Sequence, residues 1–441
     1  MPATPLDSAI YRDLLGDGEI AGLFTDNAEL RAMLLVEGAL AEAQAAQGLI
    51  PAESAEVIAR AAREVQLDPA ALAAATGRNA VPVPALVAAF RDALAAPEHA
   101  QYIHWGATSQ DIMDTGLALR LRRVLEILEG RRAATLAALA GLAERHAELP
   151  MAARTYGQAA TPTSFGAVVA GWGRPLIALR ERGDALRPRL LQVSLGGAAG
   201  TLAAMGPEGP AVRGALAATL ALADPGASWH SERAGIAELS GWLTALLTTL
   251  GRMGEDLVLM TQSGIGEVRL AEGGGSSTMP QKANPVEPSL LVALARQAVG
   301  LDANLQGAAL HRQQRDATAW IVEWLSLPQL CQIAGRALTV AEGLAGGITP
   351  QTERMIAGLD DGLGLIHAEA LTFALAREMP RPEAQAAVTA LCREAQETGT
   401  PLAKLAAARW PGHDWEALLT PRARLGTAAQ DARGFASAAR A

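Results

Sequence analysis

The chain has 441 residues, of which 50% are apolar and 19% are charged, and its formal net charge is −9. This length exceeds the size at which a single core usually keeps growing, so we expect two or three domains. The apolar content excludes a mainly disordered protein, and the acidic balance disfavours nucleic acid as a partner. The two cysteines lie far apart in sequence and match neither a metal-ligand spacing nor a disulfide framework.

The N-terminal region lacks the features of an export signal. The segment MPATPLDSAIYRDLLGDGEI is acidic and has no basic stretch followed by an apolar run. Polar or charged residues interrupt the long apolar windows, which argues against a membrane-spanning helix. We therefore expect a cytoplasmic protein with no membrane partner. Residues 1–108 hold short helical segments stopped by prolines, and we predict an N-terminal helical domain there.

A polar segment, YIHWGATSQDIMDTG, covers residues 102–116, directly before the first long helical pattern. Thr108 and Asp111 have the spacing of a capping box, which predicts that a helix begins here. The N-terminus of a helix with hydroxyl and amide side chains also suits a carboxylate. Thr108, Ser109 and Gln110 are therefore candidate substrate ligands, and the capping and binding interpretations are compatible.

Histidine and tryptophan side chains give weaker signals. His104 and Trp105 adjoin this polar segment and are candidates for lining a site, but a structural role is at least as good an interpretation. His230 and His311 belong to no recognisable ligand pattern. Surface or interface positions are the simpler interpretation for these two histidines.

The central part of the chain, residues 109–348, carries the longest helical patterns. From Ile236 to Met260, apolar residues recur at alternating spacings of three and four and form one stripe along a helix. Such helices need apolar neighbours at shallow crossing angles, which predicts a helix bundle. The segment GGITPQTERM marks a boundary, and shorter helices after it predict a small C-terminal helical domain over residues 349–441.

A second polar segment, MAARTYGQAATPTSFG, begins at residue 151. Arg154, Tyr156 and Gln158 are candidate substrate ligands, because they alternate as they would on a short extended segment, which would place their side chains on one side. Pro162 fits the first turn of the next helix. An ordinary loop with a solvated arginine is the alternative interpretation of this segment.

The third polar segment is the loop GGGSSTMPQKANP, residues 273–285. Its glycines permit backbone conformations that other residues avoid, and they allow the loop to rearrange over a bound ligand. The loop lacks the lysine spacing of a phosphate-binding Walker motif, as does the other glycine-rich segment, SLGGAAGTLAAMG. A flexible connector is the alternative interpretation of this loop by itself.

Together the three polar segments resemble the signatures of the fumarase/aspartase superfamily. The loop matches every fixed position of the pattern GSSxMPxKxNP, and TSQD and RTxGQ follow the order of the superfamily. The resemblance implies an all-α fold of three domains, in which a central bundle of long helices forms the twenty-helix core of a homotetramer. It also implies active sites that combine the three segments from three different subunits.

The resemblance further implies roles for residues of the loop. Ser276 is expected to transfer a proton at the carbon beside a substrate carboxylate, with neither a cofactor nor a metal ion. Lys282 and Asn284 are expected to hold that carboxylate and to stabilise the charge of an aci-carboxylate intermediate. A serine hydroxyl is a poor base unless its anion is stabilised, which a nearby lysine and amide dipoles can do. Ser277 and Met279 are weaker candidates for lining the site.

One position narrows the expected reaction. Where lyases of the superfamily that form fumarate commonly have a histidine tied to general acid catalysis, this chain has Tyr156. Hydroxide and amines are poor leaving groups and need a proton as they leave. A carboxylate, whose pKa is roughly 4.3 as for a glutamate side chain, needs none at neutral pH. The change therefore favours a reaction in which a carboxylate leaves or attacks.

Lactone formation by the 3-carboxy-cis,cis-muconate cycloisomerases of aromatic catabolism is such a reaction. HWGATSQDIMDT and AWIVEWLSLPQL are similar to this subfamily. The resemblance implies a small polycarboxylate substrate, a proton delivered by Ser276, and Arg315 as a carboxylate ligand. Tyr156 and Gln314 depart from the subfamily, which has tryptophan and an acidic residue at these positions, and leave the exact substrate open.

Two other functions remain open. An adenylosuccinate-type lyase that releases fumarate is favoured by HWGATSQD and by the chain length, but this chain lacks the histidine. A catalytically silent helical scaffold would keep the tetramer alone. Ser276, Lys282 and Asn284 argue against a scaffold, which has no physical need for these residues on a glycine-rich loop.

Overall fold

A computed structural model describes residues 4–271, 273–275, 278–279, 281–359 and 362–441. The described chain is mostly helical, so the predicted helical class is confirmed. It divides into two compact units. Unit 1 comprises Met1–Arg131, Leu179–Thr248 and Leu294–Ala337, and unit 2 comprises Arg132–Ala178, Thr249–Ala293 and Leu338–Ala441.

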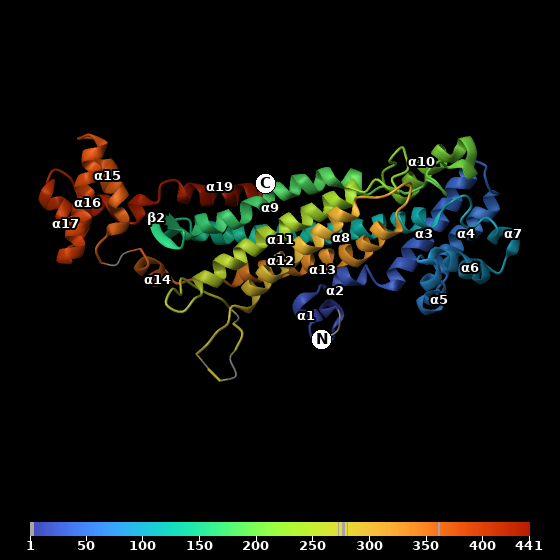
Figure 1. Cartoon of the computed structure of the whole chain (residues 1–441), viewed down its shortest axis with the longest axis horizontal. Helices are drawn as coiled ribbons and strands as arrows, with labels where there is room; N and C mark the ends of the chain where they lie inside the picture. Colours follow the sequence, from blue (N-terminus) through green and yellow to red (C-terminus); the bar gives the residue numbers. More distant parts are fainter. Residues whose placement is uncertain (1–3, 272, 276–277, 280, 360–361) are drawn as a thin grey trace. The chain divides into compact units, whose positions relative to one another are not determined.

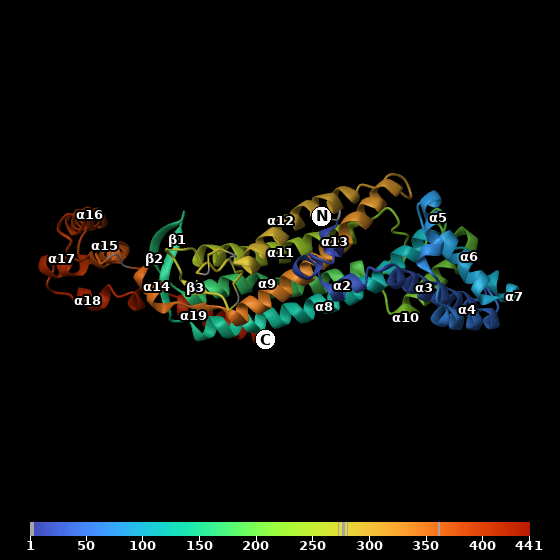
Figure 2. The ribbon, with the colours of Figure 1, turned by 90° about the horizontal axis from the view of Figure 1, so that it is seen from below.

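Five long helices contribute segments to both units. They are α8 (Ser109–Arg145), α9 (Phe165–Leu190), α11 (Ala234–Met260), α12 (Val286–Ala308) and α13 (Ala317–Gly347). Within each unit these segments lie side by side (Figures 1 and 2). In unit 1, Trp242 Nε1 of α11 donates to the carbonyl oxygen of Leu179 in α9 at 2.9 Å. In unit 2, Trp172 Nε1 of α9 donates to Asp256 Oδ2 of α11 at 2.7 Å.

The apolar stripe predicted along α11 is confirmed by burial. Its residues are at most 6% exposed: Ile236, Leu239, Leu243, Leu246, Leu250, Met253, Leu257 and Met260. Spacings of three and four place these side chains on one face of the helix, which neighbouring helices cover. The stripe thus explains why so long a helix is stable here.

Unit 1 also contains shorter α-helices. They are α1 (Arg12–Leu15), α2 (Gly18–Gly22), α3 (Asp26–Ala46), α4 (Ala52–Glu64), α5 (Pro69–Asn79), α6 (Val83–Leu94), α7 (Pro97–Ala100) and α10 (Gly209–Leu220). Helix α3 contacts both α4 and α10. A Cβ on Gly38 would lie 2.9 Å from the Ala62 Cβ, so glycine allows α3 and α4 to approach closely. Short 3₁₀ helices also occur, at η1 (Pro5–Asp7) and η2 (Ala203–Glu208).

Unit 2 contains the C-terminal helices and the short strands. They are β1 (Pro150–Thr155), β2 (Gln158–Ser164), β3 (Val268–Arg269), β4 (Thr349–Pro350), α14 (Thr352–Ala357), η3 (Leu365–His367), α15 (Ala368–Leu375), α16 (Arg381–Thr398), α17 (Leu402–Arg409), α18 (Trp415–Leu418), η4 (Arg422–Arg424) and α19 (Ala428–Arg440). Helices α15 to α18 share an apolar cluster around Trp415, which is 1% exposed. Across the described ranges, no helix combines the length and apolar character needed to cross a membrane.

The second polar segment is an antiparallel hairpin, which corrects the single extended segment predicted for it. Thr155 of β1 pairs with Gln158 of β2, and the two residues between them form the turn. Tyr156 has φ 52° and Gly157 has φ 77°, the positive values required by a two-residue turn whose twist matches that of the strands. The prediction that Pro162 opens a helix is also wrong, because Pro162 lies in β2. A two-stranded sheet has only edge strands, where proline is tolerated.

Candidate active site

The first polar segment forms the loop before α8 and the first turn of that helix. The N–H of Thr108 donates to Asp111 Oδ2 at 3.0 Å, which is one half of the predicted capping box. Thr108 and Ser109 are partly exposed, and within the described ranges neither hydroxyl has a hydrogen-bond partner. Both hydroxyls are therefore available to an anion at the helix N-terminus.

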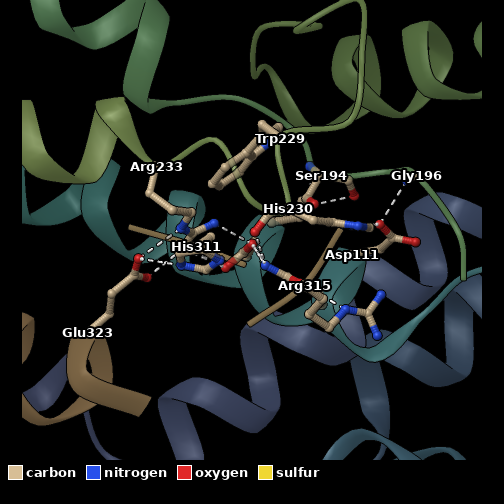
Figure 3. Close-up of polar contacts among 12 residues, drawn as sticks. Asp111, Ser194, Gly196, Trp229, His230, Arg233, His311, Arg315 and Glu323 are labelled. Carbon is tan, nitrogen blue, oxygen red and sulfur yellow. Dashed lines mark hydrogen bonds and ion pairs between the residues drawn. The ribbon is translucent and has the colours of Figure 1, made fainter. Parts of the chain in front are cut away.

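Asp111 is fully buried and connects this turn to the other glycine-rich segment, SLGGAAGTLAAMG, at residues 194–206. Its Oδ1 accepts from Gly196 N at 2.8 Å and lies 2.7 Å from His230 Nε2 (Figure 3). Its Oδ2 accepts from Gly197 N at 2.9 Å as well as from Thr108. Two donors at each oxygen satisfy an ionised carboxylate. Gly197 has φ 68°, a conformation that favours glycine, so part of the glycine-rich sequence serves this contact.

Gln110 is also fully buried and contacts Arg315. Its Oε1 accepts from Arg315 Nε at 3.0 Å, while its Nε2 donates to Asp114 Oδ2 at 3.1 Å and to the His230 carbonyl at 2.9 Å. Arg315 Nη2 lies 3.4 Å from the carbonyl oxygen of Ala198. No carboxylate of the described chain forms an ion pair with Arg315, so its charge is available to a ligand. The amide of Gln110, predicted as a substrate ligand, is thus bound by protein groups.

A buried ion cluster adjoins Gln110. Arg233 donates from Nη1 to Asp114 Oδ2 at 2.7 Å, and from Nε and Nη2 to the two oxygens of Glu323 at 2.8 and 2.6 Å. Its guanidinium also lies over the Trp229 ring, 4.7 Å from the centroid. Burial alone would lower the pKa of Arg233, but the two carboxylates raise it above its ordinary value. One cation against two carboxylates leaves one negative charge, and burial raises the pKa of Glu323.

The surface positions predicted for His230 and His311 are wrong. His230 is 2% exposed, and the side chain of His311 is fully buried. His311 Nε2 lies 3.9 Å from Glu323 Oε1, and within the described chain neither ring nitrogen has a hydrogen-bond partner. Burial lowers the pKa of His311, and Arg233 lowers it further, so a neutral ring is favoured. The sequence held no local signal for this burial, since Asp111 lies 119 positions from His230.

His104 is tied to helix α3. Its Nδ1 lies 2.7 Å from Oε1 of Glu37, which is 1% exposed. The backbone at His104 has φ 63°, a left-handed conformation uncommon outside glycine. Burial lowers the pKa of His104, but Glu37 and Asp111 together raise it above its ordinary value of 6.5. Trp105 is 43% exposed, and its carbonyl accepts from Gln44 Nε2 at 2.6 Å.

The hairpin in unit 2 carries the second group of predicted ligands. Arg154 Nη1 and Nη2 donate to Oε2 and Oε1 of Glu267 at 2.9 and 2.8 Å. Glu267 is 1% exposed, whereas the Arg154 side chain is 32% exposed. Tyr156 is fully exposed at the turn, and Gln158 is exposed beside it. The structure therefore pairs Arg154 within the protein and leaves the other two side chains accessible.

The predicted catalytic serine, Ser276, and its neighbour Ser277 lie outside the described residues. Lys282 is exposed, and its backbone N–H donates to the carbonyl oxygen of Met279 at 3.0 Å. Met279 is 42% exposed. The roles that the sequence assigns to these residues stay predictions.

A short antiparallel bridge closes the base of the loop. Gly274 N donates to the Asn284 carbonyl at 3.0 Å, and Asn284 N donates back to Gly274 at 2.9 Å. A Cβ on Gly274 would lie 2.5 Å from Val286 Cγ2, so a larger residue would push the two sides apart. At least one glycine of the loop is therefore needed for a close approach, in addition to any mobility.

The two units carry different parts of the predicted site. Unit 1 holds Thr108, Ser109, Gln110 and Arg315, and unit 2 holds the hairpin and the loop at 273–285. Among the described residues, no three His, Cys, Asp or Glu side chains are grouped as metal ligands. The side chains present offer hydroxyls, amides, a guanidinium and an ammonium, which are groups that bind and polarise carboxylates.

Comparison with known proteins places the chain in a family. The profile of a family described as Lyase matches residues 17–300. A 3-carboxy-cis,cis-muconate cycloisomerase from Pseudomonas aeruginosa is 41% identical over 420 residues, covering 92% of this chain and 91% of that protein. The chain belongs to the fumarase/aspartase superfamily of lyases. It is an enzyme of that family, as the three sequence segments predicted.

Other members of the superfamily are also similar to this chain in structure or sequence. The crystal structure of the 3-carboxy-cis,cis-muconate lactonizing enzyme from Pseudomonas putida has a TM-score of 0.92 and 34% identity, covering 98% of this chain and 99% of that one. This likeness confirms the fumarase-type fold. A nitrosuccinate lyase from Streptomyces davaonensis is 36% identical over 445 residues, covering 97% of this chain and 94% of that protein. Superfamily enzymes of similar sequence therefore carry different reaction names.

Proposed function

We propose that this enzyme closes 3-carboxy-cis,cis-muconate to 4-carboxymuconolactone. The observation that carries the proposal is the 41% identity to a cycloisomerase over 92% of the chain. The solved lactonizing enzyme, which covers 98% of the chain, supports the same reaction. Tyr156, at the position where fumarate-forming lyases commonly have a histidine, is consistent with a carboxylate as the attacking group.

In this reaction a carboxylate oxygen of the substrate forms a C–O bond at one end of a C=C double bond. The π electrons move to the adjacent carbon, whose carboxyl group holds them as an aci-carboxylate, and that carbon then takes a proton. The trianionic substrate becomes a dianionic lactone, so one proton is consumed in each turnover at neutral pH. The catalytic acid must therefore protonate a carbon atom. No acid is needed for a leaving group, because no oxygen or nitrogen group leaves in this reaction.

The residues divide among three tasks in this proposal. Ser276 delivers the proton to carbon and regains one from solvent, and Lys282 and Asn284 stabilise the negative charge of the intermediate. The free hydroxyls of Thr108 and Ser109 at the N-terminus of α8 hold a second carboxylate. Three subunits of a homotetramer contribute these groups to each site, and no cofactor takes part.

Arg315 holds a remaining carboxylate of the substrate. Its guanidinium is partly exposed and has no ion-pair partner in the described chain, so a ligand does not have to displace an internal carboxylate. A planar guanidinium can bind a carboxylate through two parallel hydrogen bonds. Three substrate carboxylates thus have three groups of receptors in this proposal.

The proposal is tested by incubating the purified protein with 3-carboxy-cis,cis-muconate at neutral pH. We expect loss of the conjugated-diene absorbance, together with uptake of one proton per turnover measured with a pH indicator in weak buffer. Ser276→Ala should slow both signals by at least about 10²-fold, whereas Ser263→Ala, the same change at an exposed serine before the loop, should retain them. Absence of turnover by the wild-type enzyme would refute the proposal.

The same assay separates the competing reactions. An adenylosuccinate-type lyase would release fumarate from adenylosuccinate and leave the muconate unchanged. Loss of a nitro group from a succinate would also fit the absence of the histidine, since nitrite is a weak base. That elimination releases a proton with fumarate and nitrite, so the direction of the pH change distinguishes it from lactone formation.

A further inference from the structure

We propose that Gln110 is a positioning residue whose carbonyl oxygen fixes the Arg315 guanidinium in the orientation that receives a substrate carboxylate. This inference rests on the proposed function in one respect, namely that Arg315 meets a carboxylate. It changes the expected role of Gln110 from a substrate ligand to a support for one.

The orientation of the Gln110 amide is determined by its neighbours. Its Nε2 faces Asp114 Oδ2 at 3.1 Å and the His230 carbonyl at 2.9 Å, and both of these groups accept hydrogen bonds. A reversed amide would place its oxygen against two acceptors and its nitrogen against the donors of Arg315. One orientation is therefore strongly preferred, and it directs Oε1 to Arg315 Nε at 3.0 Å.

The ion cluster next to Gln110 keeps Asp114 in its role as an acceptor. Arg233 donates to Asp114 from Nη1 at 2.7 Å and from Nη2 at 3.2 Å, so both oxygens of Asp114 act as acceptors and the carboxyl group cannot rotate freely. Gln110, Asp114 and Arg233 are each at most 2% exposed. Glu323 holds the other side of Arg233 (Figure 3). A chain of hydrogen bonds thus runs from this buried cluster to a partly exposed guanidinium.

Arg315 needs such a support because of where it lies. It belongs to the connection between α12 and α13, which end and begin at Ala308 and Ala317, so no helix holds its backbone. A free arginine side chain loses about 2 kcal/mol of rotamer entropy when a ligand immobilises it. The bond from Nε to Gln110 fixes the plane of the guanidinium in advance and leaves Nη1 to a ligand.

A neutral acceptor suits this task better than a carboxylate would. A glutamate in the position of Gln110 would pair with Arg315 and compete with the substrate for its charge. In the present structure the Gln110 amide nitrogen donates to Asp114 Oδ2 at 3.1 Å. An ionised glutamate would place an oxygen there, with no hydrogen to donate to Asp114. Glutamine orients the cation and leaves its positive charge for the ligand.

The test compares variants of the full-length enzyme. Gln110→Met keeps the length of the side chain and removes both hydrogen-bonding groups. We expect kcat/KM to fall about 10- to 100-fold, the equivalent of one charge-assisted hydrogen bond, mainly through KM because the carboxylate is bound before and during the reaction. A kcat/KM within twofold of wild type would overturn the proposal.

A matched pair of variants separates positioning from general stability. Asp114→Asn and Glu323→Gln each remove one negative charge from Arg233, but only Asp114 contacts Gln110. The introduced asparagine amide can donate to Gln110 and allow its amide to reverse. We expect Asp114→Asn to raise KM at least fivefold more than Glu323→Gln does. Equal effects on KM would overturn the proposal.

The pH dependence of kcat/KM in variants of Gln110 distinguishes positioning from a purely structural role, which would not change that dependence. In Gln110→Glu, a protonated carboxyl has a carbonyl oxygen for Arg315 and a hydroxyl for Asp114, and so restores two of the three hydrogen bonds of the glutamine, without the bond to the His230 carbonyl. The ratio of its kcat/KM to that of the wild type should therefore rise as the pH falls, while the same ratio for Gln110→Met stays flat. Parallel pH profiles for the two variants would overturn the proposal.

Equilibrium binding distinguishes a failure of this inference from a failure of the proposed reaction. Titration calorimetry with propane-1,2,3-tricarboxylate, a saturated probe, measures carboxylate binding without turnover. We expect Gln110→Met to bind the probe about 10- to 100-fold more weakly than the wild type. If the wild type binds the probe but does not convert the muconate, only the reaction is refuted. If both proteins bind the probe equally, the positioning role is refuted.

Discussion

Replacing Asp111 by asparagine should strongly destabilise the start of α8, although the shape of the side chain hardly changes. The two oxygens of Asp111 receive N–H groups of Thr108, Gly196, Gly197 and His230. An asparagine has one oxygen, so its NH₂ group must face two of these donors. The better orientation directs the NH₂ group toward Gly196 and His230, because a neutral imidazole can change tautomer and present Nε2 as an acceptor.

The cost can be worked out for that orientation. The Gly196 N–H loses its acceptor inside the protein, at about 1–3 kcal/mol for a buried unsatisfied donor. The bonds from Thr108 and Gly197 remain but lose a charged acceptor, at about 1 kcal/mol each. We therefore expect the free energy of unfolding to fall by about 3–5 kcal/mol, a loss typical of a broken buried polar network.

Urea denaturation at equal protein concentrations measures this difference, since any self-association would make the measured stability depend on concentration. Asp68→Asn is a matched control. Asp68 is exposed and accepts from Ala70 N at 3.0 Å at the start of α5, where asparagine caps a helix as well as aspartate. The control should stay within about 0.5 kcal/mol of the wild type. A loss below about 1 kcal/mol for Asp111→Asn would refute the four-donor reasoning.

Three further predictions concern the hairpin, His104 and Ser276, the proposed catalytic serine. Ser276→Ala should lower kcat by about 10²- to 10⁴-fold with the affinity for substrate kept, whereas Tyr156→Phe should lose far less in the same assay; equal losses would contradict the leaving-group argument. Burial lowers the pKa of His104, but Glu37 raises this pKa above 6.5, with a further increase from Asp111 and a decrease from Arg91. Glu37→Gln removes the carboxylate that contributes most to the increase. The loss of unfolding free energy in Glu37→Gln should be largest below pH 6.5 and should decrease as the pH rises through the higher folded-state pKa of His104. Denaturation at several pH values measures this loss, and a pH-independent difference would contradict the prediction. Glu267→Gln leaves Arg154 one neutral oxygen and should cost about 1–3 kcal/mol by urea denaturation, and no loss would mean that the ion pair is dispensable.

Features with a local cause could be predicted from the sequence. The buried stripe of α11 follows from apolar spacing within one helix, and the start of α8 follows from a capping pattern four residues long. The hairpin turn was missed for a local reason as well. Tyrosine is disfavoured at the φ of 52° that Tyr156 adopts, so the following glycine was the one signal of a two-residue turn.

The supports of the candidate site could not be predicted, because they join distant parts of the sequence. Asp111 meets Gly196 across 85 positions, and Gln110 meets Arg315 across 205. The sequence showed hydroxyls and amides at a helix start and two arginines, Arg312 and Arg315, after α12. It held no information on which amide atom faces which guanidinium. That detail separates a residue that touches substrate from one that holds another residue in place.

Arg154 illustrates the same distinction in unit 2. Its two terminal nitrogens are occupied by Glu267, which is 1% exposed, and a substrate carboxylate that displaced this partner would leave a buried negative charge uncompensated. The backbone of Glu267 is fixed as well, since it accepts from Gln351 N at 2.8 Å and donates to Met260 at 2.9 Å. The ion pair therefore anchors β1 to a rigid neighbour. The hairpin is therefore held two residues before the exposed Tyr156.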